Sequence, residues 1–215
     1  MILNLYAGIG GNRHLWPDGD IVAVEHDPKI AAEYARRFPS DKVVVGDAHE
    51  YLLEHYGRFD FIWSSPPCPT HSRMWGKNRT PQYTDMRLYA EILFLQRWAH
   101  GAWVVENVKP WYRPLIEPAG QSGRHVFCSN LNLFMLPEPP PTPKGFITTA
   151  TPQDIADYLG IGEPVMICCN GNHEPKQAMR NCVHPQTGRA IWDLYTANDP
   201  LHVPTGSAKR GKEVT

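Results

Sequence analysis

Two side chains with reactive groups stand directly after apolar segments of the sequence. Cys68 belongs to the stretch Ser65-Pro66-Pro67-Cys68-Pro69, which follows the apolar residues 59–63, and Glu106 follows the apolar residues 102–105. A cysteine thiolate is a nucleophile, and a nearby carboxyl group can give a proton or a hydrogen bond to a ring nitrogen. On its own, such a cysteine is more often a thiol without a catalytic role, and such a glutamate is more often a solvent-exposed carboxylate. Together they indicate nucleophilic catalysis on a ring substrate.

A glycine-rich turn and two acidic residues indicate a second kind of site. Gly8, Gly10 and Gly11 follow the first apolar segment and let the backbone approach a ligand closely. Glu25 ends the second apolar segment, where its carboxylate can accept hydrogen bonds from ribose hydroxyls, and Asp47 ends the third, where an adenine amino group can lie. The turn lacks the GxGxxG spacing of nicotinamide-binding proteins, and alone it is equally typical of an ordinary strand-to-helix turn. The three features in order favour an adenosyl ligand.

The elements that must position these residues alternate along the first half of the chain. Short apolar runs typical of buried strands alternate with helical patterns, which predicts an α/β fold with a doubly wound, mostly parallel sheet. The carboxyl ends of such strands share one edge, so we expect the glycine turn, both acids, Cys68 and Glu106 there. The expected strands are 2–6, 21–25, 43–45, 59–63 and 102–105, and the expected helices are 29–38, 48–56 and 85–100.

The second half of the chain is less regular. We expect a strand over 125–129, a helix over 151–159 and a short helix after Pro185, whereas the proline-rich residues 136–143 fit neither element. The chain therefore divides into a catalytic and cofactor-binding domain, a proline-rich segment, a C-terminal part of the catalytic domain and a flexible tail. Their expected bounds are 1–128, 129–150, 151–206 and 207–215.

The composition limits the class of protein. Of 215 residues, 42% are hydrophobic and 20% are charged, as in a globular domain. Its 21 basic and 22 acidic residues give a net charge of −1, so bulk charge does not hold the protein to nucleic acid. No apolar run approaches the ~18 residues of a membrane span, which predicts no membrane partner. Five cysteines, an odd number, without a secretion signal at the start predict free thiols and a cytoplasmic location.

The ordered motifs resemble those of the cytosine-5 DNA methyltransferases. NLYAGIGG is similar to their first motif, EHDP and GDA to the next two, SPPCP to the proline–cysteine motif and ENV to the glutamate motif. Residues 123–127 look like a reduced arginine motif, 151–161 like the helix before the closing motif, and 177–191 like the closing asparagine motif. The resemblance covers about residues 2 to 192 and implies the Rossmann-like fold of S-adenosylmethionine-dependent methyltransferases.

The resemblance implies methyl transfer from S-adenosyl-L-methionine to C5 of a cytosine flipped out of DNA. It gives Cys68 the attack on C6, Glu106 the contact with N3 and Arg124 the contact with O2. It implies no metal, and it implies these cofactor-binding residues: Tyr6, Gly8, Gly11, Glu25, His26, Asp47, Ala48, Pro67, Leu88 and Asn181.

Two segments bear on how such an enzyme holds DNA. Residues 70–84 have the composition of a mobile lid that contacts phosphates, or of a solvated basic loop, because they carry Arg73, Trp75, Lys77 and Arg79. Between Arg124 and Thr151 there is hardly room for the large target-recognition domain of the family. The resemblance is therefore to small bacteriophage-type members, and it implies loose or short-site specificity or a specificity-providing protein partner.

Some positions depart from the family, and other functions stay open. Pro69 replaces a usual glutamine, Arg180 a usual glycine and His184 a common proline. The order of motifs does not distinguish DNA from RNA as substrate. A cofactor-binding accessory subunit without activity would keep the fold, although intact Cys68 and Glu106 argue against it. A zinc-stabilised nucleic-acid-binding module could use a cluster that lacks a CxxC pair, namely Cys168, Cys169, His173, Cys182 and His184.

Overall fold

The centre of the protein is a sheet of seven strands in the part of the chain that the computed structural model describes, residues 1–73, 83–168 and 174–198. The strand order is β3-β2-β1-β4-β5-β7-β6, and all neighbouring pairs from β3 to β5 are parallel, whereas β7 is antiparallel to β5 and β6. The order reverses between β1 and β4, so the carboxyl ends of these two strands border a crevice where ligands bind in such sheets. The strands are β1 (Ile2–Leu5), β2 (Ile21–Glu25), β3 (Lys42–Val45), β4 (Phe61–Ser64), β5 (Ala102–Val108), β6 (Gly120–Ser122) and β7 (His125–Ser129).

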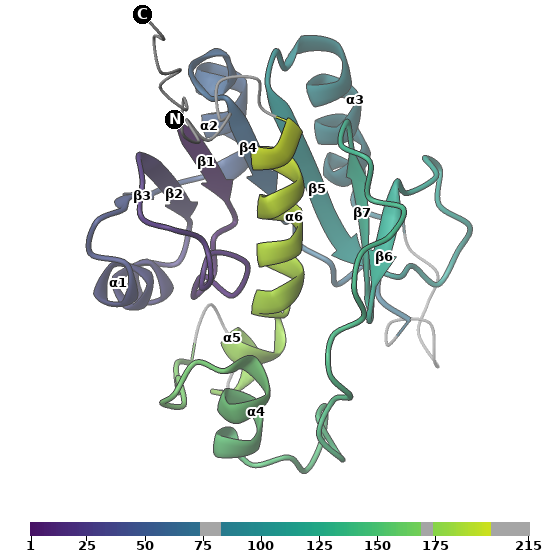
Figure 1. Ribbon diagram of the computed structural model, residues 1–215. Helices are drawn as coiled ribbons and strands as arrows, with labels where there is room; N and C mark the ends of the chain where they lie inside the picture. Colours follow the sequence, from purple (N-terminus) through teal and green to yellow (C-terminus); the bar gives the residue numbers. More distant parts are fainter. Residues whose placement is uncertain (74–82, 169–173, 199–215) are drawn as a thin grey trace, which may run out of the picture.

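Helices cover both faces of the sheet, as a doubly wound fold requires. One face packs against α1 (Pro28–Arg37) and α6 (Pro185–Asn198), and the other against α2 (Ala48–His55) and α3 (Arg87–Trp98). Figure 1 shows α4 (Pro152–Leu159) and α5 (Gln177–Arg180) beyond the ends at which the strand arrows point. The predicted fold class is therefore confirmed.

Local sequence signals set the helix starts near the crevice. Asp27 and Asp47 cap α1 and α2, because each carboxylate accepts hydrogen bonds from two backbone N–H groups of the first turn. Thr151 and Asp154 form a reciprocal capping box at the start of α4, and Gly160 ends that helix in the left-handed conformation. Of these helices, α1 and α2 begin at the edge of the sheet that carries the predicted site, because each follows a strand directly.

The core explains why α6 is longer than the short helix expected after Pro185. Ile191 and Trp192 of α6 pack against Phe61, Trp63 and Val104, so this helix spans one face of the sheet. Burial of this aromatic layer, with Trp16 stacked on Trp192 at 5.3 Å between ring centroids, stabilises fourteen residues of helix.

Three further differences separate the structure from the sequence expectations. The fifth strand continues to Val108, so Glu106 lies inside β5 and does not follow it. β6 and α5 were not expected, because three and four residues are too short to show a period. η1 (Tyr56–Arg58) extends the turn after α2.

Some sequence expectations fall on residues that the structure does not describe. Trp75, Lys77 and Arg79 of the predicted lid lie outside the described residues, and so does the predicted tail, 207–215. Among the helices that are described, none combines the length and the apolar character needed to cross a membrane.

Candidate active site

The loop after β4 holds Cys68 by backbone contacts on both sides. The Asn107 side chain donates a 2.9 Å hydrogen bond to the carbonyl oxygen of Pro66, and the Cys68 carbonyl accepts hydrogen bonds of 3.0 Å from the N–H groups of His71 and Ser72. Burial raises the pKa of the half-buried Cys68 thiol, and the nearby Glu106 raises it further. The thiol therefore keeps its proton at rest and must lose it as the sulfur attacks.

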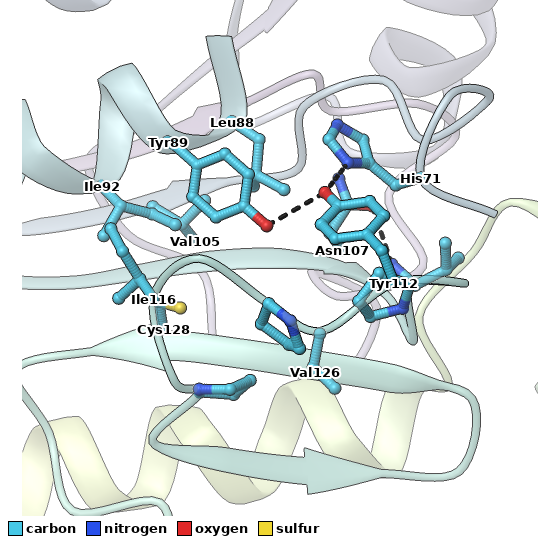
Figure 2. Close-up of a pocket in the computed structure, with 14 residues that line it drawn as sticks. His71, Leu88, Tyr89, Ile92, Val105, Asn107, Tyr112, Ile116, Val126 and Cys128 are labelled. Carbon is cyan, nitrogen blue, oxygen red and sulfur yellow. Dashed lines mark hydrogen bonds between the residues drawn. The ribbon is translucent and has the colours of Figure 1, made fainter. Parts of the chain in front are cut away.

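A chain of hydrogen bonds between aromatic side chains supports the far side of this loop. His71 Nδ1 lies 2.6 Å from the Tyr112 hydroxyl, which lies 2.9 Å from the Tyr89 hydroxyl on α3. Figure 2 shows these groups at the rim of a small apolar cavity between α3, β5 and β7. Trp111 donates its backbone N–H to the His71 carbonyl at 3.1 Å, so the chain after β5 holds the loop from a second side. These hydrogen bonds hold the Cys68 loop against α3 and the chain after β5.

Glu106 is a carboxyl group with a pKa suited to proton transfer near neutrality. It is 6% exposed, and burial raises its pKa to about 7 against the opposing effects of the Ser65 hydroxyl and the Arg124 charge. A group with such a pKa holds its proton in a large share of molecules at neutral pH and can donate it. Glu106 also shares its surroundings with Cys68, because each side chain feels the charge of Arg124.

Sequence reasoning missed His125 beside Glu106. The two residues lie on one face of the antiparallel pair β5 and β7, and His125 Nε2 lies 3.7 Å from Glu106 Oε1. Burial, with help from the Arg124 charge, lowers the pKa of His125 to about 3, so the imidazole is neutral. Its one signal in the sequence is its place in the reduced arginine motif, where it follows Arg124.

Arg124 has its own partners just before β7. Its guanidinium donates a hydrogen bond to the Arg180 carbonyl and lies 5.5 Å from the ring centroid of Phe146. Its charge lowers the pKa of both Cys68 and Glu106 against the raising effect of their burial. The structure thus brings Cys68, Glu106 and Arg124 into one electrostatic cluster, with His125 as a fourth member.

The glycine turn after β1 is open where a ligand would approach. Gly8 has φ +56, and a Cβ built on it would have no atom within 4 Å. Its N–H donates a 2.9 Å hydrogen bond to Glu25 Oε2, while Glu25 Oε1 accepts from the N–H groups of His26 and Asp27. Tyr6 begins the turn at φ 53, a conformation that costs about 1–2 kcal/mol for a residue with a side chain.

Gly11 belongs to the packing of the turn. A Cβ there would lie 2.5 Å from Cys182 Cβ and 2.8 Å from the Val183 carbonyl oxygen, so the closing motif rests directly on this residue. Asn181, beside that contact, is exposed and accepts a hydrogen bond from the Gln177 side chain. Segments near the start of the chain and near residue 182 therefore meet at the glycine turn.

The remaining residues predicted to bind the cofactor follow strands or lie in the first turns of helices. Asp47 is exposed and uses its carboxylate to cap α2, whereas Ala48 is buried. His26 and Pro67 are exposed, and Leu88 is buried in the first turn of α3. The contacts of these five residues with a cofactor stay a prediction.

The residues at the turn fit an adenosyl ligand. A carboxylate can accept about four hydrogen bonds. Three backbone N–H groups donate to Glu25, which leaves one acceptor position for a ribose hydroxyl. The space at Gly8 lies beside that carboxylate. The described residues hold no group of three metal-ligating side chains, and Cys169 and His173 of the alternative zinc cluster lie outside them.

The match to a methylase family, together with the doubly wound sheet, gives the class: a methyltransferase that uses S-adenosylmethionine. The family model for C-5 cytosine-specific DNA methylases matches residues 1–113, more than half of the 215 residues. The chain belongs to this family. The S-adenosylmethionine cofactor supplies an electrophilic methyl group when it is bound. No curated protein sequence matches the chain.

Several solved structures are similar to this chain at low identity. A hypothetical protein of Thermus thermophilus is 24% identical over 60% of this chain and 72% of its own, with a TM-score of 0.42. A TehB-like SAM-dependent methyltransferase from Corynebacterium glutamicum is 20% identical over 50% and 54%, with a TM-score of 0.34. NSun6 from Pyrococcus horikoshii, solved with SFG, is 19% identical over 52% and 33%, with a TM-score of 0.38.

Proposed function

We propose that this protein transfers the methyl group of S-adenosylmethionine to C5 of cytosine in DNA through a covalent adduct between Cys68 and C6. The observation that carries the proposal is the cluster in which Glu106, with a pKa of about 7, influences the Cys68 thiol at the carboxyl edge of the sheet. Family membership supports the same reaction.

The proposed chemistry begins with addition of the Cys68 sulfur to C6. The thiol loses its proton, a sulfur–carbon bond forms, and the C5–C6 double bond supplies the electron pair that makes C5 nucleophilic. C5 would then take the methyl group as the sulfur–methyl bond of the cofactor breaks and leaves S-adenosylhomocysteine. Loss of the C5 proton to water with departure of Cys68 would restore the ring. The cytosine must leave the duplex to reach the sulfur, at a cost of a few kcal/mol.

The neighbours of Cys68 have distinct proposed tasks. Glu106 gives a proton or hydrogen bond to N3, which draws electrons from the ring as the sulfur adds. Arg124 supplies positive charge beside the thiol and favours the thiolate as it forms. Arg124 also contacts O2 of the ring, and the neutral His125 imidazole borders the same site, 3.7 Å from Glu106.

The covalent step can be tested with a trap and a serine variant. Fluorine at C5 blocks the final elimination, so DNA containing 5-fluorocytosine should form a stable adduct with the parent protein in the presence of the cofactor. Cys68→Ser should lose adduct and methyl transfer almost completely, because a serine hydroxyl is scarcely ionised near neutral pH. Cys168→Ser changes an exposed thiol and serves as the control.

Two results would contradict the proposal. One is methylation of DNA by the parent protein without any adduct on 5-fluorocytosine, and the other is near-normal turnover by Cys68→Ser. RNA of the same sequence should be assayed as well. Methylation of RNA but not of DNA would mean that RNA is the substrate.

A further inference from the structure

A buried carboxyl group on α3 joins the ends of three neighbouring elements. Glu91 is 0% exposed, and its Oε1 accepts a 2.6 Å hydrogen bond from the Tyr6 hydroxyl. Its Oε2 accepts one of 2.5 Å from the Ser64 hydroxyl, and His49 Nδ1 lies 2.9 Å from Oε1. Tyr6 follows β1, Ser64 ends β4 and His49 lies in α2, so one side chain connects the two strands that border the crevice.

The partners of Glu91 coincide with the predicted cofactor pocket. Tyr6 is itself a predicted pocket residue, His49 follows Ala48, and Glu91 lies one helical turn after Leu88. Tyr6 is also the one non-glycine residue with positive φ among residues 1–73, 83–168 and 174–198. Its hydroxyl is thus fixed at the point where the backbone turns into the glycine segment.

We propose that Glu91 is the positioning residue of the cofactor pocket, which holds Tyr6 in its left-handed conformation and sets the entry into the Gly8 turn. The proposal rests on the proposed placement of S-adenosylmethionine at this turn. The donors argue for it, because two of them stand at the ends of the strands that border the crevice, and the third lies in α2 beside the predicted pocket residue Ala48. A carboxyl group buried for stability alone would also need hydrogen-bond donors, but these donors would not have to lie beside the predicted pocket.

Two conservative variants separate positioning from general stability. Tyr6→Phe removes one hydroxyl and keeps the ring, and Glu91→Gln keeps the shape while an amide N–H replaces one acceptor. Tyr34→Phe is the matched control, because the Tyr34 hydroxyl donates a 2.9 Å hydrogen bond to buried Asp41 on the opposite face of the sheet. The measurements are the affinity for S-adenosylhomocysteine by calorimetry, the KM for S-adenosylmethionine and the thermal midpoint.

We expect Tyr6→Phe to weaken S-adenosylhomocysteine binding roughly tenfold, and Glu91→Gln to weaken it roughly ten- to a hundredfold, the scale of hydrogen bonds to a charged group. The KM for S-adenosylmethionine should rise more than kcat falls. Tyr34→Phe should lower the thermal midpoint and keep the affinity of the parent protein within about twofold, since a change in stability alone leaves a folded site intact.

Each contrary result has a definite meaning. Parent-like affinity of Tyr6→Phe, or an equal loss in Tyr34→Phe, would overturn the role of Glu91 and leave the proposed reaction standing. Absence of binding in the parent protein would overturn the placement of the cofactor and both proposals. Should Glu91→Gln fail to fold, Tyr6→Phe and Ser64→Ala decide the question in the same assay.

Discussion

Glu106, the proposed proton donor, also affects the stability of the protein through the same proton. Its pKa is about 7 in the folded protein against an ordinary 4.5, so between these values the folded state holds a proton that the unfolded chain has released. Stability therefore falls as pH rises through this window, by about 3 kcal/mol in total. We expect Glu106→Gln to remove this loss and to unfold at higher urea concentration than the parent protein at pH 8.

Comparing the parent protein with Glu106→Gln separates the effect of Glu106 on stability from the effect of its neighbour His125. His125 titrates at about pH 3 when folded and near 6.5 when unfolded, so its contribution rises with pH over that range and is present in both proteins. The stability difference should be small at pH 4 and grow to about 3 kcal/mol by pH 8. A difference that is constant across this range would mean that burial does not hold the proton on Glu106.

At the scale of elements, the glycine turn packs directly against the closing motif at Gly11. Gly11→Ala would place a methyl group 2.5 Å from Cys182 Cβ, and neither backbone can yield cheaply. We expect a loss of about 1–3 kcal/mol in unfolding free energy and weaker cofactor binding. Gly57→Ala is the control, because a Cβ at Gly57 meets no atom within 4 Å. Equal stability of both variants in urea would contradict this role of Gly11.

Sequence patterns predicted the elements whose signals are local. They missed side chains that meet only in the folded protein and are far apart in the sequence. The alternation of strands and helices and the motif around Cys68 lie within short stretches, so the fold class and the position of the Cys68 loop after a strand could be predicted. Glu91 had only an indirect signal, an acidic residue within the apolar stripe of Leu88, Ile92 and Leu95 on α3. Its donors lie 85, 42 and 27 residues away, and no spacing rule connects them.

At the scale of the whole molecule, the segment between β7 and α4 bears on the choice of target sequence. The described residues 130–151 contain no helix or strand. They return the chain along β6, where the Ser122 hydroxyl donates to the Pro137 carbonyl at 2.7 Å and the Gly123 N–H donates to Glu138 at 2.8 Å. The major groove of a duplex admits a helix or a two-stranded ribbon, and residues 130–151 contain neither.

We therefore expect target choice by the protein alone to be loose, or limited to a short site of about two to four base pairs, since each base pair read needs its own contacts. Bisulfite sequencing of plasmid treated with the purified protein measures this, with Cys68→Ser as the control for background. Methylated cytosines should share only a short common sequence. Strict methylation of a site of about six or more base pairs by the protein alone would contradict the expectation. Methylation that becomes site-specific only when host extract is added would assign the choice to a partner protein.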